Sequence, residues 1–240
     1  MNPPSPGANR TPHPPSHPVV TVLLALLVVA FDAALLMLAL GGAHALFGHP
    51  RALALLGVYA ATGIPLALWR PVRDQDVVST RPDPGWRLLL LFVVPVVIPA
   101  ISAFGERARV ATLPAFAALG WFGVALAAFG LVLRITAMVR LGPRFAPVPA
   151  LQRAHALETG GPYAYVRHPG YLGSWLAALG AMLAFRDGLA MPLFVLFSWL
   201  LAERARREDT MLEAHFGDAH RVWARRTGAF LPRTGRRPER

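Results

Sequence analysis

The sequence predicts an all-α integral membrane protein, and two observations support that prediction. Of the 240 residues, 55% are hydrophobic, whereas soluble domains average about 45–50% apolar residues. The apolar residues also fall in continuous runs, several of them near the roughly 20 residues that a helix needs to cross a bilayer. A membrane β-barrel would instead show short segments of alternating polarity.

Each apolar run predicts one helical element. Four runs predict N-terminal transmembrane helices, and the first of them contains Asp32, which we expect to face other helices because a carboxyl group is costly in lipid. Two shorter runs, separated by the turn sequence "RDG", predict a tight transmembrane hairpin. The charged segment 203–226 predicts a cytoplasmic amphipathic C-terminal helix. The four N-terminal runs are 19–40, 53–69, 86–104 and 113–139, and the hairpin runs are 171–185 and 189–201.

Composition divides the chain into four parts. Residues 1–18 are rich in Pro and Ser and predict a disordered leader. This leader has neither the basic start nor the cleavage site of a signal peptide. Residues 19–140 hold the N-terminal helices, 141–232 form a polar and amphipathic core around the hairpin, and 233–240 are a basic tail.

The distribution of arginine predicts the orientation of the chain. The 24 basic residues are all arginine. With the N-terminus inside and the spans alternating, only Arg51, Arg107, Arg109 and Arg186 fall outside. This distribution follows the positive-inside rule and predicts that both termini are cytoplasmic. We then expect the basic tail to meet lipid headgroups or solvent rather than nucleic acid. The chain has no cysteine, which excludes disulfides and thiolate chemistry, and its histidines lack metal-ligand spacing.

Two polar segments are predicted to lie together on the cytoplasmic side. The first is "GPYAYVRHPGYLG", in which Pro169 favours a helix start. A helix start there would place free N–H groups beside Arg167 and His168, which suits an anion. The second is "ERARREDTMLEAHFGDAH", where Arg204 and Glu208 share a helix face. Taken singly, the first segment also fits an aromatic membrane anchor and the second a solvated helix.

Together, these two segments resemble the isoprenylcysteine carboxyl methyltransferase family and its phospholipid methyltransferase relatives. The resemblance rests on "HALETGGPYAYVRHPGYLG", the hairpin and "REDTMLEAHFGDAHRVWARRTGAFLP", and it covers about residues 141–232. It implies an S-adenosylmethionine site, with Glu208 closing the pocket and Arg204 binding the methyl acceptor. The other implied cofactor contacts are His155, Ala156, Leu157, Glu158, Tyr163, Arg167, His168, Pro169, Gly170 and Tyr171.

This chain departs from the family pattern at several positions. The acidic pair is Glu208–Asp209 instead of two glutamates, Glu158 replaces a valine, and His220 and Trp223 replace two tyrosines. None of these changes removes a residue that the implied site requires.

The resemblance implies methyl transfer from S-adenosylmethionine to a lipid-like or prenylated acceptor, without a metal. A carboxylate acceptor needs orientation but no base, and Arg204 is suited to bind it in a bidentate way. An amine acceptor would need a base such as His168 or Glu208. Two alternatives remain open: a membrane reductase of the sterol-reductase type that uses NADPH, and a transporter or scaffold.

Overall fold

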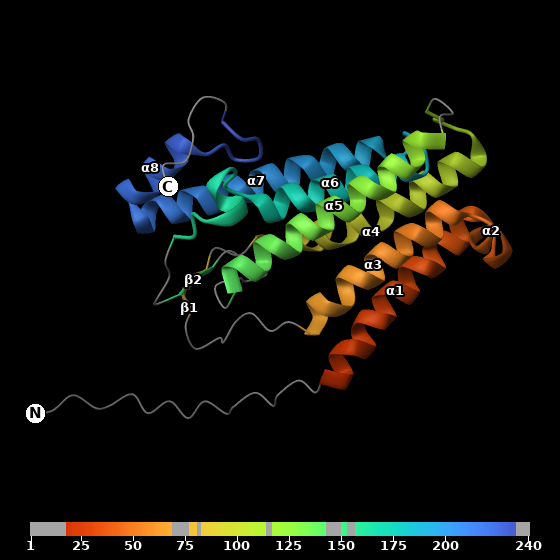
Figure 1. Cartoon of the computed structure of the whole chain (residues 1–240), viewed down its shortest axis with the longest axis horizontal. Helices are drawn as coiled ribbons and strands as arrows, with labels where there is room; N and C mark the ends of the chain where they lie inside the picture. The colour runs from red at the N-terminus through yellow and green to blue at the C-terminus, as the bar shows by residue number, and fades with distance from the viewer. Residues whose placement is uncertain are drawn as a thin grey trace, which may run out of the picture.

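The computed structural model describes residues 18–68, 77–80, 83–113, 117–142, 150–152 and 157–233. Helices form most of this part, and they lie roughly along one long axis (Figure 1). The elements in chain order are α1 (Pro18–Leu40), α2 (Ala43–Phe47), α3 (Pro50–Leu68), β1 (Val77–Thr80), α4 (Gly85–Ala108), α5 (Ala117–Leu141), β2 (Ala150–Gln152), the 3-10 turn η3 (Gly161–Ala164), α6 (Pro169–Ala184), α7 (Met191–Phe216) and α8 (Asp218–Arg226).

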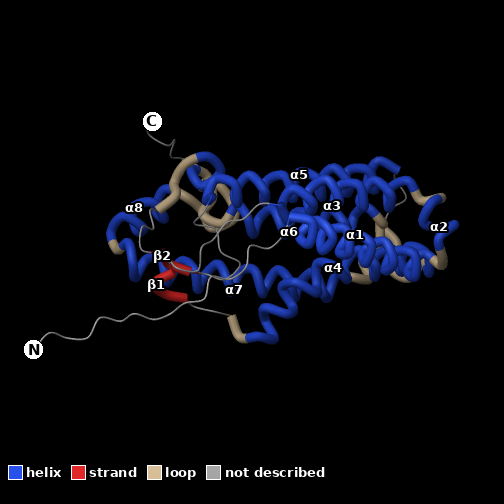
Figure 2. The backbone as a smooth tube through the Cα atoms, turned by 90° about the horizontal axis from the view of Figure 1, so that it is seen from below, coloured by secondary structure: helices blue, strands red, loops and turns tan. Residues whose placement is uncertain are grey.

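The predicted helical membrane architecture is confirmed in outline. Within the described residues, three helices are long and apolar enough to cross a membrane: Val22–Leu40, Gly85–Ala108 and Ala118–Leu141. Asp32 is 8% exposed, so it faces other helices, as expected. One feature was not predicted: β1 and β2 pair antiparallel, with Ser79 opposite Leu151, at the same end of the molecule as α8 (Figures 1 and 2).

The C-terminal helix differs from the prediction. We expected one amphipathic helix over 203–226, but α7 runs unbroken from the apolar run to Phe216, and α8 is a separate helix. The break lies at Gly217, whose φ of 53° is in the left-handed region that favours glycine. The charged residues 203–216 therefore form the second half of α7 and are continuous with the apolar first half of the same helix.

Glycines bring α5 and α6 into direct backbone contact, because they carry no side chain to hold the helices apart. Gly123 and Gly130 on α5 face Gly180 and Gly173 on α6. A Cβ atom on Gly130 would lie 2.5 Å from the carbonyl oxygen of Gly173 and 2.6 Å from the nitrogen of Ala177. Neither backbone atom can move away without shifting a helix. This contact fixes the start of α6, and therefore the predicted site, relative to α5.

We expect Gly130→Ala to destabilise the protein by about 1–3 kcal/mol, since the added methyl group forces the two helices apart. The thermal melting temperature of the detergent-solubilised protein measures this loss. Gly57→Ala is the matched control, because a Cβ atom there meets nothing within 4 Å. Equal melting temperatures for the two variants would contradict the proposed role of the α5–α6 contact.

An ion-pair cluster joins the helices at the end of the bundle that lies away from the predicted site. Glu106 on α4 accepts hydrogen bonds from Arg51 of α3 at 2.6 Å and from Arg186 of the α6–α7 turn at 3.0 Å. His49 also lies 3.1 Å from Glu106. Two of the four arginines that we predicted on the outer side are thus paired with one carboxylate. The cluster ties three elements together far from the predicted site.

Candidate active site

The polar loop before α6 is fixed by backbone pairing with the chain that follows α8. The backbone N–H of Arg167 donates to the carbonyl of Gly228 at 2.8 Å, and that of His168 donates to Ala229 at 3.0 Å. His168 is the N-cap residue of α6, and Pro169 occupies the first helical turn. The helix start that the sequence predicts at Pro169 is therefore confirmed. The segment that follows α8 therefore holds this loop in place through backbone hydrogen bonds.

Asp209 on α7 joins the two residues that precede α6. An ionised carboxylate only accepts hydrogen bonds, so the Nε2 atom of His168 donates to Oδ1 at 3.1 Å. Arg167 donates from Nε and Nη2 to Oδ2 at 3.2 and 3.1 Å. Burial by itself raises the pKa of Asp209, but the hydrogen bonds and charges of His168 and Arg167 outweigh burial and lower this pKa to about 2. Asp209 therefore stays ionised over the physiological pH range.

A second chain of hydrogen bonds links α6, α7 and Asp83, which lies two residues before α4. The hydroxyl of Tyr171 donates to Oε2 of Glu208 at 2.6 Å and accepts from Nε of Arg204 at 3.0 Å. Nη1 of Arg204 donates to Oδ2 of Asp83 at 2.8 Å. His168 stacks on Tyr171, with ring centroids 5.5 Å apart. The structure thus brings together five of the predicted residues: Arg167, His168, Tyr171, Arg204 and Glu208.

Tyr163 and Leu157 lie in a separate apolar cluster beside α5. Tyr163 is 8% exposed, and its hydroxyl donates to the carbonyl of Ala137 at 3.4 Å. The indole N–H of Trp223 on α8 donates to the carbonyl of Tyr163 at 3.0 Å. Leu157 packs against the same cluster. In this structure Tyr163 and Leu157, both predicted as cofactor contacts, pack in this apolar cluster and help to hold the loop before α6. Trp223 belongs to the same cluster and stands where the family pattern has a tyrosine.

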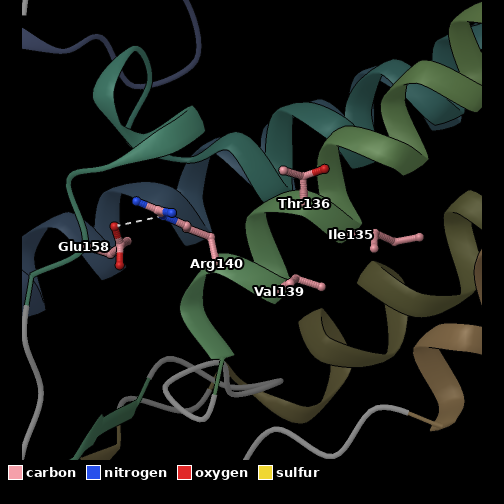
Figure 3. Close-up of a pocket in the computed structure, with 5 residues that line it drawn as sticks. All are labelled: Ile135, Thr136, Val139, Arg140 and Glu158. Atoms are coloured by element: carbon pink, nitrogen blue, oxygen red, sulfur yellow. Dashed lines mark ion pairs between the residues drawn. The ribbon is translucent and has the colours of Figure 1, made fainter.

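Glu158 lies at the edge of an open cavity of about 600 Å³ on the surface of α5. Its Oε1 atom lies 3.4 Å from Nε of Arg140, the ion pair drawn in Figure 3. The other lining residues are Ile135, Thr136 and Val139, which follow one another along α5 (Figure 3). One side of the cavity is therefore charged and the other mainly apolar. The predicted residues His155 and Ala156 lie outside the described residues.

Three residues at the site were not predicted from the sequence. Asp209 was noticed only as half of an acidic pair, and Asp83 not at all. His220 was noted only as a departure from the family pattern. It is 3% exposed, and within the described residues neither ring nitrogen has a hydrogen-bond partner. Its Nε2 atom lies 3.5 Å from Oδ1 of Asp209. His220 and Trp223 are the buried residues of α8, so they mark the face that this helix packs against the rest of the molecule.

The comparisons with known proteins concern the family that this chain resembles. Residues 123–214 match the model of the isoprenylcysteine carboxyl methyltransferase (ICMT) family. The resemblance to that family is confirmed. The matched segment contains the loop, the α6–α7 hairpin and the acidic pair, but it ends before α8. Within the described residues, no group of three His, Asp or Glu side chains is placed to hold a metal ion.

Several curated relatives of the chain share one name. The protein-S-isoprenylcysteine O-methyltransferase of Schizosaccharomyces pombe is 35% identical over 106 residues, which cover 43% of this chain and 45% of that protein. The enzyme of the same name from Tribolium castaneum is 31% identical over 113 residues, which cover 46% of this chain and 40% of its own length. The alignments thus span less than half the length of these two relatives.

A solved structure shares the fold over most of the chain. It is a eukaryotic intramembrane Ras methyltransferase, ICMT, which is 23% identical to this chain, with a TM-score of 0.56. The alignment covers 89% of this chain and 83% of that one. The fold is therefore that of a helical membrane protein, and the similarity extends into the N-terminal helices that the family model does not cover.

Proposed function

We propose that this chain is an S-adenosylmethionine-dependent methyltransferase that methylates the carboxylate of a prenylated cysteine or a similar lipid-borne acceptor. The observation that supports this most strongly is the hydrogen-bonded chain Glu208–Tyr171–Arg204. It sets an anionic group beside a cationic one at the end of an apolar hairpin. The family match and the names of the relatives point to the same chemistry.

The side chains present fit the proposed cofactor. Glu208 is about one-quarter exposed and suits an ammonium or ribose hydroxyl group, and the stacked rings of His168 and Tyr171 offer aromatic surface. When bound, S-adenosylmethionine supplies an electrophilic methyl group, whose bond to sulfur breaks as the acceptor oxygen attacks its carbon. A carboxylate acceptor carries no proton to remove, so the chain needs no general base for it. What remains for the protein is orientation, which alone can contribute about 7–11 kcal/mol.

The residues divide between donor and acceptor in this proposal. Arg204 orients the acceptor carboxylate. Glu208 and the loop from Tyr163 to Tyr171 hold the donor, together with residues 155–158. The core is 141–232, and 19–140 supplies four spans that form a lipid-facing scaffold. The hairpin lets a lipid tail enter sideways, and both termini face the cytoplasm. The leader, up to residue 17, and the tail, from residue 234, lie outside the described residues.

Binding calorimetry separates this proposal from the reductase alternative. We expect the purified, detergent-solubilised chain to bind S-adenosylmethionine and not NADPH. The relatives found are named as methyltransferases, which favours this result. Binding of NADPH alone would favour a reductase. Binding of neither would leave a transporter or scaffold as the better interpretation.

We expect His168→Ala to weaken S-adenosylmethionine binding by roughly ten- to a hundredfold. A hydrogen bond to a charged group contributes about 1.5–3 kcal/mol, and His168 holds the first turn of α6 against Asp209. Calorimetric titration measures this change. His215→Ala is the control, since that histidine is exposed and lies on α7, the helix that carries Asp209. Unchanged affinity in the His168 variant would remove this residue from the donor site.

A further inference from the structure

The strongest unassigned feature at the site is a buried carboxylate outside the family segment. Asp83 lies two residues before the start of α4, whereas the family model begins at residue 123. Its side chain is 4% exposed, and the side chain of its partner Arg204 is 8% exposed. A buried ion pair of this kind is costly to form and more costly to break, because breaking it leaves an uncompensated charge.

The packing of α4 on α7 brings Asp83 to this position. Val94 and Ile98 on α4 share an apolar cluster with Phe197 on α7. Pro84 follows Asp83 and restricts its backbone to extended conformations. The carboxylate therefore reaches Arg204 from a fixed point, although 121 residues separate the two in sequence.

Asp83 and Tyr171 together hold the plane of the Arg204 guanidinium. Asp83 accepts from Nη1 and the Tyr171 hydroxyl accepts from Nε, so two nitrogens of the rigid fork have fixed partners. The same hydroxyl donates to Glu208. Tyr171 therefore lies between Arg204 and the proposed donor residue Glu208, and it can keep its hydrogen bond to Glu208 when Arg204 shifts.

Asp83 does not neutralise the positive charge of this region. Its second oxygen lies 3.5 Å from Nη1 of Arg207. Glu203 pairs with Arg87, Arg206 and Arg207. The carboxylates of Asp83 and Glu203 therefore pair with four arginine side chains in all. Positive charge remains in excess and can attract an anionic acceptor.

We propose that Asp83 is a positioning residue that orients Arg204 for the carboxylate of the methyl acceptor. This inference rests on the proposed function. It gives the N-terminal half of the chain a role in orienting the residue that binds the acceptor. Because Asp83 acts through Arg204, its removal affects acceptor binding and turnover and leaves donor binding unchanged.

Initial rates of labelled-methyl transfer from S-adenosylmethionine to a soluble prenylcysteine test the proposal in the purified full chain. We expect Asp83→Asn to raise the acceptor KM about ten- to a hundredfold, with the S-adenosylmethionine KM within about twofold of wild type. Asp83→Glu should recover part of the loss. Glu213→Gln is the control, since it removes a half-exposed carboxylate of α7 that pairs with Arg221, outside this charge cluster.

Three outcomes would overturn the proposal: kinetics of Asp83→Asn equal to those of Glu213→Gln, an equal rise in both KM values, or a lower acceptor KM. The last would mean that Asp83 competes with the acceptor for Arg204. If the wild type transfers no methyl group, the proposed function fails, and the thermal melting of Asp83→Asn, Arg204→Gln and the double variant still tests the pair. A double-variant shift smaller than the sum of the single shifts supports the coupling, and additive shifts contradict it.

Discussion

Replacing Arg204 by alanine is expected to lower kcat/KM for the acceptor by roughly 30- to 5,000-fold. Truncating one member of a buried, hydrogen-bonded charge pair costs about 2–5 kcal/mol, and each 1.36 kcal/mol is a factor of ten in rate. Here the truncation removes the proposed carboxylate ligand. It also leaves Asp83 without its 2.8 Å partner. Donor affinity should change little, because Glu208 and His168 remain.

Arg204→Lys keeps the positive charge that Asp83 needs, so the fold should be preserved. A loss of turnover in this variant would therefore not result from misfolding. Lysine can still neutralise Asp83, but it lacks the planar fork that also reaches Tyr171. We expect this variant to melt near the wild-type temperature and to lose most of its turnover. Arg206→Ala is the control, since that side chain is 66% exposed and pairs only with Glu203 among the described residues. Full turnover in the lysine variant would rule out bidentate binding of the acceptor.

Asp209→Asn is expected to destabilise the folded protein by about 2 kcal/mol. The pKa of Asp209 is lowered to about 2, and each unit of pKa shift corresponds to about 1.4 kcal/mol. The variant loses the charge that Arg167 and His168 contact. For a chain of this size, such a loss lowers the melting temperature by roughly 4–8 °C. Donor binding should weaken as well, since the loop before α6 loses its anchor on α7.

The pH dependence gives an independent check on Asp209. A carboxyl group whose folded-state pKa is lowered contributes stability above its unfolded pKa, near 4, and loses it as pH falls towards 2. The melting temperatures of wild type and Asp209→Asn should therefore differ at pH 6 and converge between about pH 4 and pH 2. Asp218→Asn, on the exposed first turn of α8, is the control and should stay close to the wild type, because its ion pair with Arg221 is exposed to solvent. A difference that persists at pH 2 would contradict the account.

The local features of the site could be predicted from the sequence because they depend on neighbouring residues. Proline at 169 predicts the start of α6, and the i,i+4 spacing of Arg204 and Glu208 predicts their shared face. The arginine distribution predicts that the loop and the charged part of α7 lie at one end, and Figure 1 shows both near α8. Hydropathy also locates α1, α3, α4, α5 and α6 to within a few residues, but it places the end of α7 too early.

The missed features depend on contacts between distant segments. Nothing near Asp83 indicates that it meets Arg204, because the contact follows from the packing of α4 on α7. The break at Gly217 was overlooked because the charge pattern continues across it, although glycine followed by the acidic Asp218 is a helix-boundary signal. The burial of His220 depends on how α8 folds back, which the charge pattern alone does not reveal.

We propose above all that one site, built from the loop before α6 and from α7, transfers a methyl group to a carboxylate. The most direct test supplies the purified chain with methyl-labelled S-adenosylmethionine and a prenylcysteine, either as its free carboxylate or as its carboxamide. The account predicts that the free carboxylate gains label as a base-labile methyl ester and that the carboxamide gains none. No labelling of the carboxylate, or equal labelling of the carboxamide, would contradict it.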